Sequence, residues 1–225
     1  LNFETRALLN RIATVGNPPD TRRKNLMNDF IFGTKYDIGI KSLSEAFDCN
    51  WFLAAHDQQA SKLNWVKNAH NLTEVNSPIW TLNRGFAGNG TTSYLNSNFA
   101  PSQGINFTQN NATVGIYSRT DGIVAGVDFG SIHLASTIYY FTQLNIKYTG
   151  NLCYIICNTN EVAPISFTNT NSATGLYSMQ RISSNTTKAY RNEILLSTLT
   201  KVSNTPNSLS MYIGARNNDG NADSF

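Results

Sequence analysis

From Asn50 onward the chain is a succession of short runs rich in β-branched and aromatic residues, each ended by Gly, Asn or Pro. Apolar and polar residues alternate in several of these runs, most clearly in 112–118. A period of two predicts strands with one buried face, and turn residues at this spacing favour an antiparallel sandwich or barrel. We therefore expect a mainly β fold, an antiparallel β-sandwich, over residues 48–225.

The strands of this sandwich can be assigned from the same pattern. Asp121-Gly122, between two β runs, is the strongest hairpin signal. The predicted strands are 51–55, 77–82, 93–95, 112–118, 123–129, 132–141, 152–157, 175–182, 189–196 and 210–215.

Residues 1–47 predict a different structure, a short helical segment. Apolar residues follow a helical spacing over 3–12, Gly and Pro interrupt it over 16–19, and Asp20 or Thr21 is placed to cap a second helix. A third short helix is expected over 40–47. So few apolar residues cannot form a core alone, so we expect this segment to dock on the sandwich, on a neighbouring copy or on another protein. The apolar face of the second helix would contain Leu26, Met27, Phe30 and Ile31.

The composition points to a protein that works outside a cell or in a particle. Charged residues make up 14% of the chain, against about 25% in ordinary soluble domains, and 30 asparagines suggest a surface wetted by amides. The net charge is only +3, and the basic residues do not form a stripe interleaved with aromatic residues. Nucleic acid is therefore not an expected partner. The run Arg22-Arg23-Lys24 is either a contact for an acidic partner or a solvated helix end. No apolar stretch is long enough to span a membrane.

Three cysteines, Cys49, Cys153 and Cys157, bear on the cellular setting. In a strand the last two would have Cα atoms about 13 Å apart, too far for a disulfide. We predict three free, buried thiols, as in a protein assembled in a reducing cytoplasm.

Several segments, in this order, resemble bacteriophage structural and tail proteins with a concanavalin A-like (LamG-type) jelly roll. The resemblance implies a jelly-roll sandwich behind a short helical segment. Two departures stand out: the family's "YRNG" turn reads Tyr190-Arg191-Asn192-Glu193 here, which centres the turn on Asn192, and the family continues with one more strand and a helix where this sequence ends at Phe225. The matching segments are "LAAHDQQASKLNW", "VNSPIWTLNRGFAGNGTTSYLNSNFAPS", "NATVGIYSRT", "KAYRNEILLSTLT" and "SLSMYIGARNNDG".

Residues for catalysis are hard to find. Sandwich glycosidases need two carboxylates, about 5–5.5 Å apart in retaining enzymes, but Asp128, Glu161 and Glu193 each lack an alternating acidic partner. The dipeptide His56-Asp57 has no accompanying serine elbow. We interpret it as structural, and we expect no catalytic residues and no enzymatic activity.

Ligand binding remains open at two places. Asn217, Asn218, Asp219 and Asp223 are oxygen-rich loop residues, and the resemblance to LamG-type sandwiches implies a rim calcium as the only cofactor to consider; a plain polar turn is the alternative. Sugar binding would require exposed rings beside amides. The available rings, most of them expected in the core or in cross-strand pairs, are Tyr94, Tyr117, Tyr139, Tyr140 and Tyr177.

The sequence thus predicts a virion structural protein, a tail, fibre or capsid-surface module assembled in the host cytoplasm. It would act in particle assembly or host-surface attachment. Its expected partners are other virion proteins, in a homo-oligomer or multi-copy assembly, and a host-surface glycan. The alternative is a secreted or surface carbohydrate-binding, lectin-like domain of a bacterium.

Overall fold

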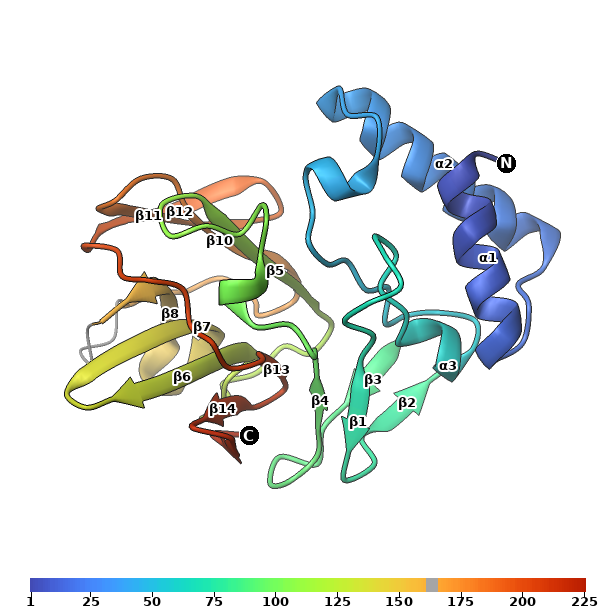
Figure 1. The fold of residues 1–225 in the computed structure, drawn as a ribbon. Coiled ribbons are helices and arrows are strands. Elements are labelled where there is room, and N and C mark those ends of the chain that lie inside the picture. Colours follow the sequence, from blue (N-terminus) through green and yellow to red (C-terminus); the bar gives the residue numbers. More distant parts are fainter. Residues whose placement is uncertain (161–165) are drawn as a thin grey trace. The chain divides into compact units, whose positions relative to one another are not determined.

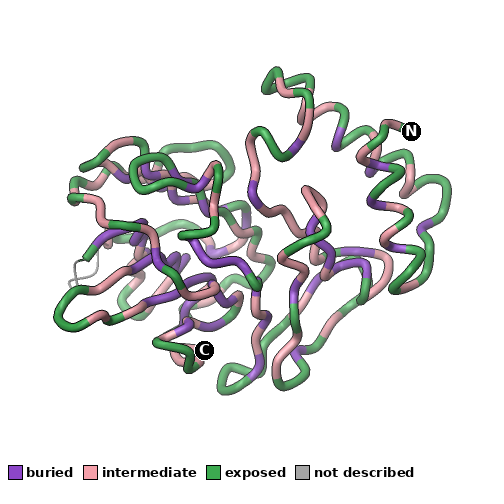
Figure 2. The backbone as a smooth tube through the Cα atoms, viewed as in Figure 1, coloured by how far each residue is buried: buried purple, intermediate pink, exposed green. Residues whose placement is uncertain are grey.

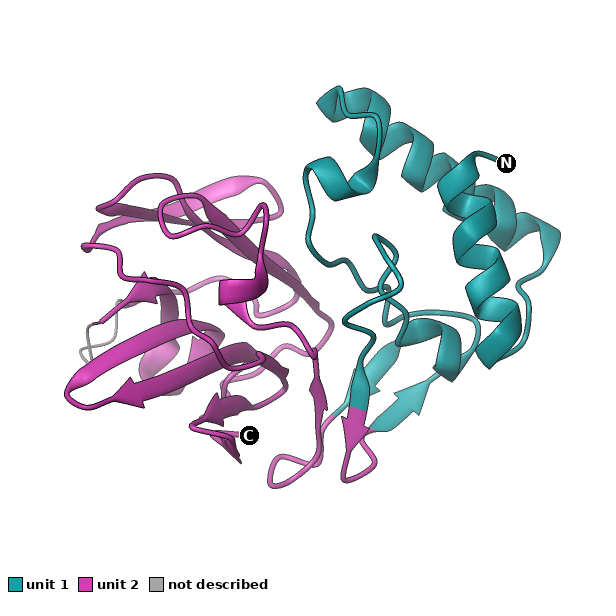
Figure 3. Ribbon diagram, in the orientation of Figure 1, with its two compact units in different colours: residues 1–73, 79–87 teal, residues 74–78, 88–225 magenta. Residues whose placement is uncertain are grey.

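The computed structural model describes residues 1–160 and 166–225 and is mainly β, with 35% of residues in strands and 20% in helices (Figure 1). The chain divides into two compact units (Figure 3). Unit 1 comprises residues 1–73 and 79–87, and unit 2 comprises residues 74–78 and 88–225. The division falls later in the chain than the predicted boundary between residues 47 and 48.

The two long helices of unit 1 each begin at a capping side chain, and for the second helix this is one of the two predicted caps. The Asn2 side chain accepts a hydrogen bond from the backbone N–H of Thr5 and starts α1 (Phe3–Val15). Asp20 does the same for the N–H of Arg23 and starts α2 (Thr21–Ile38). The predicted third helix is only one 3-10 turn, η1 (Leu43–Glu45).

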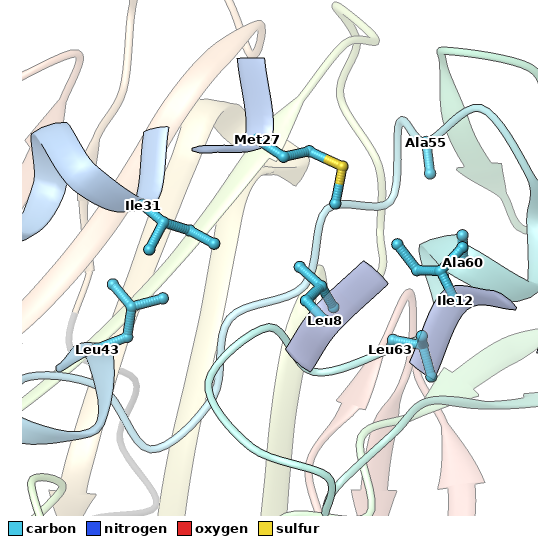
Figure 4. Packing of buried hydrophobic residues seen from close by; sticks show 8 residues of the cluster. All are labelled: Leu8, Ile12, Met27, Ile31, Leu43, Ala55, Ala60 and Leu63. Carbon is cyan, nitrogen blue, oxygen red and sulfur yellow. The ribbon is translucent and has the colours of Figure 1, made fainter. Parts of the chain in front are cut away.

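The core of unit 1 explains the later division. Buried side chains of α1 and α2 pack with Leu43 and with residues 55–66, which had been predicted to open the sandwich (Figure 4). Residues 51–55 do not form the predicted strand; only Trp51 bridges to Asn64, and a short helix, α3 (Gln58–Ser61), follows. Unit 1 also holds the hairpin of β2 (Ile79–Thr81) and β3 (Gly85–Ala87). The buried residues of the cluster are Leu8, Ile12, Met27, Ile31, Leu43, Ala55, Ala60 and Leu63.

The larger sheet, which belongs to unit 2 except for Thr73 at the start of β1, is ordered β1-β4-β13-β6-β7-β8-β9, with β14 and β15 attached beside β6. Its long strands β6 and β7 form a hairpin that continues into β8. The pairing of β14 with β6 is parallel, and the other registers described in this sheet are antiparallel. The strands are β1 (Thr73–Val75), β4 (Tyr94–Asn96), β6 (Phe129–Ala135), β7 (Ile138–Tyr148), β8 (Leu152–Thr159), β9 (Ser166–Thr168), β13 (Tyr212–Ile213), β14 (Arg216–Asn218) and β15 (Asn221–Asp223).

The second sheet of unit 2 has four antiparallel strands in the order β12-β11-β10-β5. The predicted strand over 189–196 is in fact two strands joined by a tight turn, because Asn192 (φ 46°) and Glu193 (φ 71°) both adopt the left-handed region that a two-residue hairpin needs. The turn is centred on Asn192, as predicted. The strands are β5 (Ala112–Ser118), β10 (Gly175–Arg181), β11 (Thr186–Arg191) and β12 (Ile194–Thr200), and short 3-10 turns occur at η2 (Pro101–Gln103) and η3 (Thr149–Asn151).

Three further sequence predictions in unit 2 are wrong. Residues 123–129 are not a strand except for the first residue of β6, and Asp121-Gly122 is not a hairpin turn, because the Asp121 carboxylate instead accepts the N–H of Ala173, 52 residues away. The predicted strand over 132–141 is interrupted at Ser136 (φ 58°), where the chain turns from β6 into β7.

The inner face of the four-stranded sheet lies against β7 and β8. Buried and exposed stretches alternate along the strands of unit 2 (Figure 2). Along β10, Tyr177 and Met179 are buried while Leu176 is exposed. Arg181, at the end of β10, is fully buried, and its Nε donates to the Cys157 carbonyl of β8 at 2.5 Å. The two sheets of unit 2 therefore face each other across a shared core.

Candidate binding surfaces

Carboxylates in the described part of the chain give no sign of a catalytic pair. Asp128 accepts a hydrogen bond from the N–H of Ile146 at 2.7 Å, and burial, without a contribution from a second carboxylate, raises its pKa to about 6. Glu193 is exposed in the β11–β12 turn, and Glu161 lies outside the described residues. Asp128 is thus a single, partly buried acid whose carboxylate is held by a backbone N–H.

The His56-Asp57 dipeptide has two separate structural roles. His56 Nε2 lies 2.8 Å from the Asn17 carbonyl. The Asp57 carboxylate caps α3 and accepts from Asn17, and these hydrogen bonds lower its pKa against the opposing effect of burial. Both side chains thus tie the α1–α2 loop to the start of α3.

A different His–Asp pair, which sequence analysis missed, joins His133 of β6 to Asp219. The Nδ1–Oδ1 distance is 2.5 Å, and Asp219 also accepts the backbone N–H of Leu134. Nothing in the sequence signals this pair, because it depends on the parallel contact of β14 with β6 across 86 residues. Its effect is to pin the turn after β14 to the edge of β6.

The cysteines are free, as predicted, and two of them are buried, whereas Cys49 is partly exposed. Burial raises the pKa of Cys49, Cys153 and Cys157 to about 12. A thiol must ionise to act as a nucleophile. At neutral pH these side chains therefore behave as small apolar groups.

The calcium candidates lie close together, but internal donors occupy their oxygens. Asp223 accepts hydrogen bonds from Arg216 and Asn218, and Asp219 is bonded to His133. The buried Asn217 side chain donates to the Ser210 carbonyl and accepts from the Gly220 N–H. Within the described residues no group of three or more His, Cys, Asp or Glu side chains gathers as metal ligands. The contacts match a polar turn, in which Arg216 already supplies the positive charge.

Of the five candidate tyrosines, Tyr117 is the one with a freely accessible ring. Tyr177 is buried, with 1% of its surface exposed, and Tyr94 stacks on Tyr212 at 4.4 Å. Tyr139 and Tyr140 are partly buried on β7. Tyr117 on β5 is 66% exposed and lies on the outer face of the four-stranded sheet.

Apolar side chains of all four strands extend this outer face. Cross-strand neighbours form one row, Gly115–Ser178–Tyr190–Leu195, and Tyr117 pairs with Leu176 beside it. Leu176 is 46% exposed and Leu195 is 49% exposed. The next row is polar, Thr113–Gln180–Lys188–Thr198. We call these ten residues the outer sheet face. Its apolar half consists of Tyr117, Leu176, Tyr190 and Leu195 together with the small residues Gly115 and Ser178.

Of this surface, only Tyr117 was predicted as a candidate ligand contact. Leu176, Tyr190 and Leu195 came from predicted strands, but the partner strands and their register were unknown. A usable signal was present in 175–181, where alternation places Leu176 opposite in orientation to buried Tyr177.

Comparison of this chain with family models, with curated proteins and with solved structures finds no match. Of the helices in the described residues, none combines the length and the apolar character that crossing a bilayer demands.

Proposed function

We propose that the chain is a non-catalytic module of a bacteriophage virion, a tail, fibre or capsid-surface component that acts in particle assembly, host-surface attachment or both. The observation that carries the proposal is the apolar half of the outer sheet face, where Tyr117, Leu176 and Leu195 are each about half exposed or more. Contiguous exposed apolar groups with a polar border are typical of interaction surfaces. The order of the family-like motifs supports the phage setting.

The finer fold is part of the same proposal. Two facing sheets in unit 2 are compatible with a concanavalin A-like jelly roll, and the His133–Asp219 contact fixes the turn that contains the "ARNNDG" motif. In a particle, many copies of one weak surface act together, and avidity replaces the affinity that a single shallow face lacks.

Immunogold electron microscopy tests the virion assignment. Antibodies raised against the full chain should label purified phage particles at repeated positions, and a matched antibody against an unrelated host protein should not. Labelling of the bacterial surface without labelling of particles would contradict the proposal.

A lectin-like role is the second candidate, and the outer sheet face favours it through Tyr117, an exposed ring next to the polar row containing Gln180 and Lys188. Flat sugar faces stack on rings while hydroxyls bond to amides. On a glycan array, sub-millimolar binding by the isolated monomer would favour this role over assembly.

Two controls locate any sugar site. Tyr117→Ala should abolish binding if the sheet face is used, whereas Tyr36→Ala, a change at an exposed tyrosine of unit 1, should leave it unchanged. Loss of binding on addition of a calcium chelator would instead place the site at residues 217–223.

A further inference from the structure

Unit 1 contains a cavity of about 190 Å³ that none of the roles considered above uses. Its aromatic wall comes from α2 and from the segment before and after α3: Phe30 meets Phe52 edge-on at 4.7 Å, and Phe52 meets Trp65 at 4.0 Å. An empty apolar cavity of about 150 Å³ holds a benzene ring. The space therefore suits one aromatic ring or one branched aliphatic side chain, and it is too small for a long acyl chain.

The lining of the cavity contains basic but no acidic side chains. Its polar members are Arg23, His56 and Trp65, and no Asp or Glu lines the cavity. Arg23 donates to the side chain of Asn83, and it makes no ion pair within residues 1–160 and 166–225. Arg22 and Lys24 flank it in the first turn of α2, which holds no acidic residue.

The acidic residues of unit 1 that could be expected to pair with Arg23 make other contacts or lie outside the cavity lining. The Asp20 carboxylate caps α2, and Asp57 caps α3 and binds Asn17. Asp29 is on α2 but does not line the cavity. The guanidinium of Arg23 is thus the charged group available at an otherwise apolar pocket.

The rim favours a protein segment over a small free ligand. Leu26 is 57% exposed and Phe30 is 39% exposed, and Ala54 on the opposite segment is also exposed. A single ring in the cavity would leave this rim in water, whereas a peptide backbone crossing it would cover the rim and reach Arg23.

We propose that this pocket binds an acidic peptide segment of a partner protein, taking one large apolar side chain into the cavity and one carboxylate onto Arg23. The proposal concerns unit 1 alone. Its failure and the failure of the virion or lectin assignment, which are tested on particles and on the outer sheet face, are separate outcomes.

Fluorescence polarisation with the full chain and three labelled, capped octapeptides tests it. The first peptide is glutamate-rich with a central tryptophan, the second replaces the tryptophan with alanine, and the third replaces the glutamates with lysines. We expect the first to bind and the other two to bind at least tenfold more weakly. Equal binding of the lysine peptide, or no binding of any, would overturn the proposal.

Matched variants place the binding in the pocket. Arg23→Gln should weaken the first peptide about fivefold or more, while Arg22→Gln, the same charge change one residue away, should change it less than twofold. Ala54→Trp should fill the mouth and abolish binding, whereas Ala7→Trp on the exposed side of α1 should not. Unchanged binding by Ala54→Trp with wild-type circular dichroism would place the peptide elsewhere and overturn the inference.

Analytical ultracentrifugation distinguishes a different occupant. If the chain self-associates and Ala54→Trp dissolves the oligomer, the pocket holds a second copy rather than an acidic partner, and the proposal is wrong. If the wild type and Ala54→Trp have the same oligomeric state, the peptide result stands.

Discussion

The two units differ in how many amide side chains they bury, one in unit 1 (Asn64) and several in unit 2. The core of unit 1 is a cluster of aliphatic side chains between helices and one irregular segment. Unit 2 places amides and a guanidinium in its interior: Asn145, Asn158, Asn169 and Arg181 are all at most 2% exposed. Each donates a hydrogen bond to a backbone carbonyl of another segment. A β-rich unit with long irregular connections has many backbone groups to satisfy, and buried amides do this where neighbouring strands cannot.

This contrast changes the meaning of the asparagine-rich composition. From the sequence we expected the 30 asparagines to wet the surface with amides, and the exposed ones do so. Several, however, are internal links between loops and strands. Others, including Asn83, Asn151 and Asn192, adopt positive φ and turn the chain.

The largest expected effect lies in the apolar core. Leu8→Ala should lower the free energy of unfolding of unit 1 by about 3–4 kcal/mol, because it removes a fully buried side chain and leaves a cavity. Tryptophan fluorescence in a urea titration reports this unit selectively, since Trp51, Trp65 and Trp80 all belong to it. Leu26→Ala, at a mainly exposed position of α2, is the control and should cost less than about 1 kcal/mol.

Removing an internal amide tests the other half of the comparison. Asn169 Nδ2 donates to the Ile146 carbonyl at 2.9 Å and to the Tyr177 hydroxyl at 3.1 Å. Asn169→Ala should cost about 2–3 kcal/mol in denaturation followed by far-ultraviolet circular dichroism, because buried acceptors lose their donor. Exposed Asn171→Ala, two residues away, should cost less than about 0.5 kcal/mol. Equally small decreases in the free energy of unfolding for both variants would show that the buried amide does not stabilise the unit more than an exposed one.

The same contrast decides how far the sequence predicted the structure. Periodicity located β5 and β10 almost to the residue, because regular alternation reflects one buried face, and β8 was located as a short apolar run that is buried on both faces over most of its length. Capping chemistry placed the start of the second helix at Asp20 or Thr21, and the structure shows Asp20 as the cap of α2. Asp121-Gly122 misled, because its carboxylate bonds to a residue 52 positions away. The outer sheet face and the His133–Asp219 pair were beyond reach, because both depend on strand neighbours and register that no local pattern encodes.

An internal acid should make the stability of unit 2 depend on pH. Burial raises the pKa of Asp128 to about 6, so the folded state binds its proton more tightly than the unfolded state. The contribution of Asp128 to the free energy of unfolding is fully present below about pH 4, where the carboxyl is protonated in both states, and it is lost as the pH rises through about 6. Asp128→Asn keeps an acceptor for the Ile146 N–H and should raise stability at pH 7 by about 2 kcal/mol while flattening this slope.

Asp121→Asn is the control of opposite sign for that experiment. The hydrogen bond from the N–H of Ala173 lowers the pKa of Asp121, so its charged form is favoured in the folded state. Removing that charge should not stabilise the protein at pH 7. The free energies of unfolding of both variants are compared by urea titrations at several pH values between about pH 4 and pH 7.5, a range that covers the titration of Asp128. A gain in both variants would mean that net charge, rather than burial of Asp128, sets the slope.

The smallest expected effect concerns the turn between β11 and β12, at Asn192 and Glu193. Glu193 adopts φ 71° with a full side chain, a conformation that costs a non-glycine residue about 1 kcal/mol or more. Glu193→Gly should therefore raise stability by about 0.5–1 kcal/mol, after the added freedom of the unfolded chain is subtracted. That gain corresponds to an increase in Tm of about 1–4 °C in thermal circular dichroism. Glu193→Ala removes the same carboxylate but keeps the strained backbone, so it should give no gain. If alanine stabilises as much as glycine does, the charge of Glu193 is the unfavourable element, and the hairpin tolerates its left-handed turn without cost.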